Sequence, residues 1–179
     1  MSSPRLVFLY GPPAVGKLTV ARAIAGREPF KVLHNHVAID PVVEVLPFGT
    51  PAFWRIVGGL RRDLVAAAAE EGIDLIYTFV FAPGDEQHVE DIVTAYEERG
   101  GSVLFVQLLA SRDVLLRRVL AEDRKLHGKI SEPATLEPLL DQYDNFTASI
   151  GREDLVIDLG TTSAAEAAEQ ILGRLAAQN

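Results

Sequence analysis

The amino-acid sequence predicts a three-layer α/β/α fold built on a five-stranded parallel sheet. Strand-like and helix-like segments alternate along the 179 residues with short breaks, and no repeat or low-complexity tract interrupts them. Residues 103–109 form a nearly continuous apolar run, which is typical of a strand covered by helices on both faces. Because strands separated by helices are joined by right-handed crossovers, we expect all five strands to run parallel.

The first half of the chain begins with an apolar run, Arg5–Tyr10, which ends at a glycine and is predicted to be the first strand. A helix is expected over Lys17–Gly26, and a short strand over Lys31–His34. Residues 41–51 are rich in proline and are expected to be irregular. A long helix should lie between Pro51 and Gly72, because apolar side chains recur there at three- and four-residue spacing.

The second half alternates in the same way. Apolar residues occupy one face of each expected helix, and turn-forming residues separate the elements. The expected elements are a strand at 73–81, a helix at 85–99, a strand at 103–109, helices at 113–124 and 136–148, a strand at 155–159 and a helix at 164–177.

Length and composition favour one globular domain, residues 1–179, over two. The formal net charge of −8 argues against broad nucleic-acid binding, which needs a surplus of basic residues, so no nucleic acid is expected as a partner. There is no cysteine, which excludes disulfides and thiolate metal sites. No apolar run is long enough to span a membrane, and the N-terminus leads directly into a strand, so we expect a cytoplasmic protein without a membrane partner.

A phosphate-binding loop is predicted between the first strand and the first helix, where the sequence fits G-x-x-x-x-G-K. Glycines permit backbone conformations in which successive N–H groups point at phosphate oxygens, and the helix dipole adds positive potential. The lysine would reach the β- and γ-phosphates. A chance turn before a helix is the alternative, but strand, loop and helix are all in register. The predicted nucleotide-binding residues are Gly11, Pro12, Pro13, Ala14, Val15, Gly16 and Lys17.

The residue after the lysine is normally Ser or Thr, whose hydroxyl binds Mg²⁺, but here it is Leu18, and Thr19 follows. The Gly-Lys-x-Thr ending resembles adenylate kinase and its relatives. That resemblance implies ATP and Mg²⁺ as cofactors, with Leu18 and Thr19 beside the phosphates. Thr19 would contact phosphate, and the metal would be held largely through water, an arrangement that Mg²⁺ tolerates.

Other branches of P-loop proteins lack support in the sequence. There is no guanine-reading Asn-Lys-x-Asp motif, and the third predicted strand ends without the acids of an AAA+ motor. Asp158 is better explained as a strand-end residue. In its order of elements, nearly the whole chain resembles the small-molecule and nucleoside-monophosphate kinases, including adenylate, shikimate and gluconate kinases, and also uncharacterised AAA-family small ATPases. This resemblance is specific at residues 11–19, and it implies the strand order 2-3-1-4-5.

In those kinases, a helix after the fourth strand carries arginines and runs into a lid, which here corresponds to residues 121–135. The resemblance implies that Arg117 and Arg124 stabilise the transferring phosphoryl group and that Arg118 binds the nucleotide. Arg117 and Arg124 are seven residues apart and so share a helical face. A solvated charged face is the alternative interpretation.

Polar residues follow the second predicted strand, in a region that carries acceptor-binding acids in shikimate-kinase-like proteins. If His34 and His36 continue the strand, they point to one face and, with Asn35, could bind an acceptor. Asp40 or His36 could activate an acceptor hydroxyl. Packed histidines, and an Asp40 that caps the turn at Pro41, are the alternatives. A two-histidine metal site would lack a third ligand.

Further acceptor contacts are expected at Arg55, which could hold an anion, and at Thr78 and Phe79 near the end of the third strand. Phe53 is expected in the core, and Asp85 as a helix cap. Together these features predict an ATP-dependent phosphotransferase acting on a hydroxyl or phosphate of a small molecule. A non-catalytic nucleotide sensor or a partner-coupled ATPase is the alternative, favoured by Leu18 and by the acid-free third strand.

Overall fold

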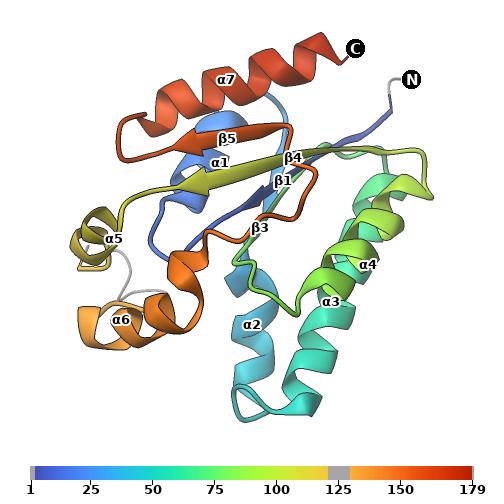
Figure 1. The fold of residues 1–179 in the computed structure, drawn as a ribbon. Helices are drawn as coiled ribbons and strands as arrows, with labels where there is room; N and C mark the ends of the chain where they lie inside the picture. The colour runs from blue at the N-terminus through green and yellow to red at the C-terminus, as the bar shows by residue number, and fades with distance from the viewer. Residues whose placement is uncertain (1–2, 121–129, 179) are drawn as a thin grey trace.

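The computed structural model describes residues 3–120 and 130–178 and contains a five-stranded, fully parallel sheet (Figure 1). The strand order is β2-β3-β1-β4-β5, which confirms the predicted order and fold class. The first strand lies at the centre of the sheet, so the loop after it opens at the middle of the carboxyl edge. The strands are β1 (Arg5–Tyr10), β2 (Lys31–Leu33), β3 (Leu75–Phe79), β4 (Ser102–Leu109) and β5 (Leu155–Asp158).

Helices cover both faces of the sheet, as Figure 1 shows. Helices α1 and α7 pack on one face, and α3 and α4 on the other. The described helices are α1 (Lys17–Ala25), α2 (Asn35–Val43), α3 (Pro51–Glu70), α4 (Glu86–Glu97), α5 (Arg112–Arg118), α6 (Pro133–Gln142), the 3₁₀ turn η2 (Asp144–Phe146) and α7 (Ala164–Ala177).

The two cores follow from the alternation of side chains along the strands. In β1, Val7 and Leu9 face α1 and α7, whereas Phe8 and Tyr10 face α3 and α4. Each of these side chains is fully buried. Because both faces of the sheet are covered, the strands carry apolar residues at nearly every position, the pattern that predicted them.

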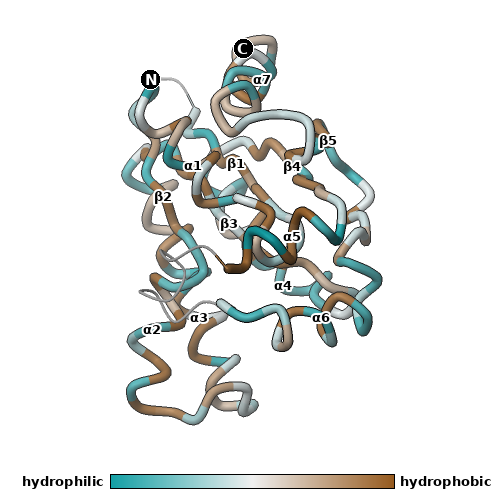
Figure 2. Tube along the Cα trace, turned by 90° about the vertical axis from the view of Figure 1, so that its left-hand side faces the viewer, coloured by the Kyte–Doolittle hydropathy of each residue, from teal (hydrophilic) through white to brown (hydrophobic). Residues whose placement is uncertain are grey.

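Helices α2 and α3 form an arm that projects from the carboxyl edge of the sheet and has a small core of its own. That core consists of Ala38 and Val42 from α2 and Phe53 and Val57 from α3, so Phe53 is a core residue as predicted. Thr50 caps α3 by accepting a hydrogen bond from the Phe53 N–H at 3.2 Å. In Figure 2, hydrophobic segments continue from the sheet into this arm.

The prediction that residues 41–51 are irregular is partly wrong, because α2 extends to Val43 with Pro41 inside it. Proline removes one backbone donor from a helix. The burial of Ala38 and Val42 against α3 holds the helix together across that position. The predicted helix at 136–148 starts earlier, at Pro133, and breaks at η2, where three consecutive residues have positive φ angles of 44°, 55° and 55°.

The predicted helix at 113–124 corresponds to α5 over its first half, and residues 121–129 lie outside the described part of the chain. None of the helices in the described ranges is both long and apolar enough to cross a membrane.

Candidate active site

The predicted phosphate loop, residues 11–17, which is called the phosphate loop below, joins the centre of the sheet to the start of α1 through a backbone that only certain residues can adopt. Gly11 has a φ of +145°, and a Cβ atom there would lie 2.1 Å from the carbonyl oxygen of Leu108. Gly16, with a φ of +114°, sits directly before α1, and Ala14 also has a positive φ of 66°. The two motif glycines are therefore required by the loop itself, independently of any ligand.

Lys17 lies over this loop, and its predicted contact with phosphate stays a prediction. Its ammonium group donates hydrogen bonds to the carbonyl oxygens of Gly11 and Pro12, both at 2.7 Å. The ammonium is thus held at the mouth of the loop, where the N-terminus of α1 also contributes positive potential.

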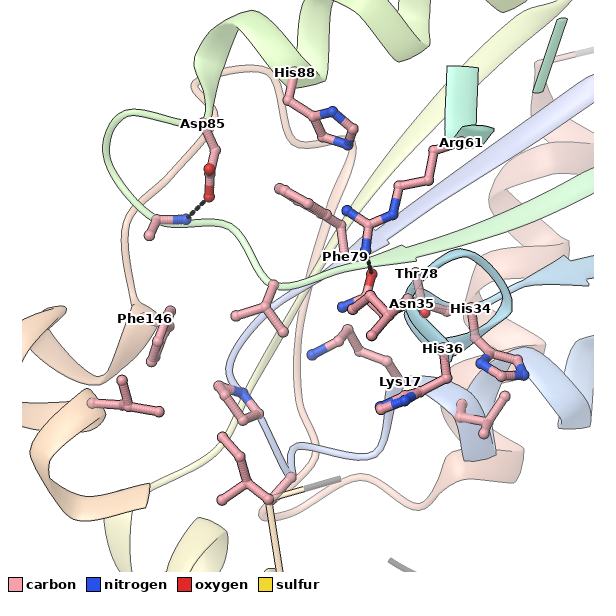
Figure 3. Close-up of a pocket in the computed structure, with 18 of the residues that line it drawn as sticks. Lys17, His34, Asn35, His36, Arg61, Thr78, Phe79, Asp85, His88 and Phe146 are labelled. Carbon is pink, nitrogen blue, oxygen red and sulfur yellow. Dashed lines mark hydrogen bonds between the residues drawn. The ribbon is translucent and has the colours of Figure 1, made fainter. Parts of the chain in front are cut away.

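One cavity of about 950 Å³ extends from the phosphate loop between the α2–α3 arm, the end of β3, α4 and the α6–η2 segment (Figure 3). Its volume is that of a large small-molecule site. The cavity brings together most of the residues predicted from the sequence. Those that line it are Pro13, Ala14, Gly16, Lys17, Leu18, Thr19, His34, Asn35, His36, Asp40, Thr78 and Phe79.

The expectation that His34 and His36 share one face of a strand is wrong. The strand ends at Leu33, His34 is the residue before α2, and His36 lies in the first turn of that helix. The Nδ1 atom of His36 lies 2.8 Å from Oδ1 of Asp40, four residues later. Asp40 therefore pairs with His36 and does not cap a turn at Pro41.

Arg61, in the middle of α3, is the main cavity residue that the sequence prediction missed. It is only 4% exposed, and its Nη2 donates to Oδ1 of Asn35 at 3.3 Å. Its guanidinium also lies 5.9 Å from the centre of the Phe79 ring (Figure 3). Among the described residues, Nε has no hydrogen-bond partner. No ion pair within the described ranges includes this side chain.

The sequence did contain a signal for Arg61. Apolar residues recur every four positions in α3, at Phe53, Val57 and Val65, and position 61 falls in the same row. A cation in the buried row of a helix is rare unless it is paired. Arg55, the arginine chosen from the sequence, is exposed and does not line the cavity.

Asp85 and His88 lie near Arg61 at the end of the cavity formed by α4. Asp85 is the N-cap residue of α4, as predicted, but its side chain makes no capping bond, and its carboxylate instead accepts a hydrogen bond from the Ala82 N–H at 2.9 Å. Burial raises the pKa of Asp85. Burial, followed by the charge of Arg61, lowers the pKa of His88 to about 4, so this imidazole is neutral at pH 7. His88 Nε2 lies 2.8 Å from the Tyr77 hydroxyl.

The arginines predicted to close over the nucleotide lie in different places. Arg118 donates to the carbonyl oxygens of Val15, at 2.7 Å, and Leu159, at 2.8 Å, and so ties the phosphate loop to the end of β5. Arg117 is exposed and does not line the cavity. Arg124 and most of the predicted lid at 121–135 lie outside the described residues. Nucleotide contacts by these arginines therefore stay predictions.

A protein-built metal cage is absent from the described residues, which contain no group of three or more His, Asp or Glu that could hold an ion. Thr19 places a hydroxyl on the cavity at the start of α1, whereas Leu18 offers none. This donor set fits Mg²⁺ that arrives with the nucleotide and keeps most of its water.

Comparison with known proteins supports the fold. No protein-family model matches the chain, and no curated protein matches it either. Solved structures do: a sugar kinase from Janibacter sp. has a TM-score of 0.68 and 19% identity, and the alignment covers 97% of this chain and 95% of that one. A gluconokinase from Sinorhizobium meliloti has a TM-score of 0.65 and 17% identity over 99% and 95% of the two chains.

A shikimate kinase from Acinetobacter baumannii is similar to the same degree, with a TM-score of 0.64 and 17% identity over 99% and 95% of the chains. At these identities the likeness is one of fold. The chain has the three-layer fold of the P-loop small-molecule kinases, with a phosphate loop at the central strand and a large cavity beside it.

Proposed function

We propose that this protein transfers the γ-phosphate of ATP to a small-molecule acceptor. One observation carries the proposal: a single cavity runs from the phosphate loop and Lys17 to the His36–Asp40 pair and to Arg61. A nucleotide bound at the loop would present its terminal phosphate to polar groups on the arm, which is the arrangement that in-line transfer requires.

Lys17 and the loop would bind the phosphates. The lysine ammonium, now bonded to the carbonyls of Gly11 and Pro12, would turn to the β- and γ-phosphate oxygens. Mg²⁺ bound to the nucleotide would neutralise phosphate charge and be held largely through water, while the Thr19 hydroxyl, which lines the cavity, would contact phosphate.

The His36–Asp40 pair would orient and deprotonate the acceptor hydroxyl. When Nδ1–H of His36 donates to Asp40, Nε2 carries a lone pair that can accept a proton. Asp40 then fixes the tautomer and the ring orientation, while His36 is the general base. The proton of the acceptor hydroxyl would pass to His36 Nε2. The hydroxyl oxygen would bond to the γ-phosphorus as the bond between that phosphorus and the leaving oxygen of ADP breaks.

A nucleotide sensor or partner-coupled ATPase is the competing function. Leu18 in place of a hydroxyl residue, and a β3 strand that ends at Phe79 without an acid, favour it. Such a protein would bind ATP but show no turnover that depends on an acceptor.

The test is to incubate the protein with Mg-ATP and a pooled metabolite extract and to search for phosphorylated products by mass spectrometry. Lys17→Met should abolish product formation, whereas Lys31→Met, a change at an exposed lysine on β2, should not. A product that also forms with Lys17→Met would contradict the proposal. Absence of product with ATP binding intact would favour the sensor.

A further inference from the structure

The Arg61 guanidinium is a buried cation without a carboxylate partner among the described residues. Removing a charge from water is costly unless an opposite charge and hydrogen bonds replace the water. The amide of Asn35 takes one of its five N–H groups, the Phe79 ring contributes a cation–π contact, and the Tyr77 hydroxyl also interacts with the guanidinium. None of these contacts brings a negative charge to the guanidinium.

Within residues 3–120 and 130–178, no neighbouring carboxylate forms an ion pair with it. The charge of Asp85 interacts with that of Arg61 at longer range, but the carboxylate lies beyond ion-pairing distance and accepts a hydrogen bond from the Ala82 N–H. His88 is neutral because of its burial and of Arg61 itself. Since Arg61 lines the cavity, the group that completes its coordination can come from a ligand. A guanidinium group favours oxyanions that can accept two of its hydrogen bonds at once, such as carboxylate and phosphate.

The same cavity has an unusual apolar wall at the tip of the arm. Phe48 and Trp54 are 64% and 44% exposed, and their rings pack edge to face with 5.4 Å between centroids. Ile39 and Val43 of α2 and Val80 after β3 extend the apolar lining. Large aromatic side chains are seldom left this open, and a wall of this kind offers a polyhydroxylated ligand few hydrogen-bond partners beyond the Trp54 indole N–H.

We propose that the acceptor is an amphipathic anion. Its carboxylate or phosphate binds Arg61 and Asn35, and its apolar, ring-sized body packs against Phe48 and Trp54. The inference rests on the proposed function, because the ligand it describes is the phosphoryl acceptor. The apolar wall distinguishes this cavity from a site for an open-chain sugar acid. In such a site, hydrogen-bonding partners for the sugar hydroxyls would line the wall that Phe48, Trp54 and Val43 occupy here.

Trp54 is the only tryptophan in the chain, so its fluorescence reports on the wall directly. We would titrate the protein, without ATP, with phenylacetate and phenyl phosphate, and compare benzyl alcohol and gluconate. At least one aromatic anion should change the emission saturably and bind at least about tenfold more tightly than either comparison ligand, the ratio expected for one charge-assisted hydrogen-bonded contact. The better of the two anions identifies which oxyanion Arg61 selects.

Arg61→Gln should remove this preference, and Arg62→Gln, at the exposed neighbouring arginine, should keep it. Arg61→Met, which retains the apolar stem without the charge, replaces Arg61→Gln if that variant does not fold. Phe48→Ala should bring the affinity for phenyl phosphate down towards that for inorganic phosphate. The inference is overturned if benzyl alcohol or gluconate binds as tightly as the aromatic anions, or if binding survives both Arg61 variants.

These binding measurements involve no catalysis, so they separate the two proposals. Aromatic anions that bind through Arg61, together with no phosphorylated product from the extract, would leave the subsite standing and reject the kinase. A phosphorylated polyol from the extract, with no binding of aromatic anions, would support the kinase and reject this acceptor class.

Discussion

His36 Nδ1 lies 2.8 Å from Asp40 Oδ1, one turn further along α2, and both side chains line the cavity that begins at the phosphate loop. The pair exists because the chain turns into a helix at His34, which puts residues 36 and 40 on the same face. His36 and Asp40, which the sequence analysis gave as alternative activating groups, therefore form one hydrogen-bonded pair.

Replacing His36 should slow phosphoryl transfer more than it weakens binding. We expect His36→Gln to lower kcat by about 100-fold, the usual contribution of a general base, with little change in KM for ATP. Asp40→Asn should have a smaller effect, because the imidazole remains while its orientation is lost. Steady-state kinetics with the identified acceptor measure both, and Asp63→Asn on the exposed face of α3 is the control. Equal activity of His36→Gln and the intact protein would exclude this residue as the base.

Gly11 should not tolerate a side chain. Its φ of +145° and the 2.1 Å approach of a Cβ atom to the Leu108 carbonyl oxygen both oppose alanine. We expect Gly11→Ala to lower the free energy of unfolding by about 3 kcal/mol, from overpacking and backbone strain together. Gly173→Ala, in α7 with no atom within 4 Å of the added Cβ, should instead raise it by about 1 kcal/mol. Urea denaturation of both variants provides the comparison, and a Gly11→Ala protein as stable as the parent would refute this view of the loop.

The buried imidazole of His88 should make the fold sensitive to mild acid. Its pKa falls from 6.5 to about 4 on folding, so the unfolded chain binds more protons between these values. The contribution of neutral His88 to the free energy of unfolding is therefore fully present above pH 6.5. It decreases progressively as the pH falls towards 4, and the total decrease is up to about 3 kcal/mol.

Urea denaturation between pH 4.5 and 7 would measure this loss, and His88→Gln, which keeps a partner for the Tyr77 hydroxyl, should flatten the slope. Asp85, whose pKa is raised, acts in the opposite sense, but it is present in both proteins and cancels in the comparison. Parallel pH profiles for the two proteins would show that His88 does not titrate with unfolding.

Arg118 should act on ATP binding through the loop backbone. Its two donors hold the carbonyls of Val15 and Leu159, and Val15 lies inside the phosphate loop. We expect Arg118→Met to weaken ATP binding about tenfold, the effect of losing one to two charge-assisted hydrogen bonds. Arg27→Met, at an exposed arginine paired with Glu169, should leave the affinity unchanged in isothermal titration calorimetry. Equal affinities for the two variants would mean that the loop keeps its shape without this brace.

Much of the fold could be predicted because its signals are local. The strand order agrees with the resemblance to kinases, which implied it. The strands themselves are apolar at nearly every position, and the predicted phosphate loop carries its glycines at fixed spacing, so both lie where the sequence predicts them. These features depend on residues adjacent in the chain.

The acceptor side depended on packing that no local pattern reveals. Whether His34 and His36 continue a strand or start a helix is decided by the burial of Ala38 and Val42 against α3, far along the chain. Arg61 could not be predicted as a site residue from spacing alone, because it stands in the row of α3 that Phe53 and Val57 mark as apolar, and only the packing shows that a cation is buried there. The resemblance to kinases implied nucleotide contacts by basic residues after β4. One of these residues, Arg124, lies outside the described part of the chain, so its contact stays a prediction.

The separate core of the α2–α3 arm has a consequence for how this protein could diversify. The phosphate loop is supported by the core of the sheet, whereas His36, Asp40, Phe48 and Trp54 are carried on an arm whose packing rests on four residues of its own. Under the proposed function, mutations in the arm would change which acceptor binds without disturbing the residues that hold the nucleotide. Substitutions in the α2–α3 arm could then alter acceptor specificity while the sheet and its phosphate loop stay unchanged.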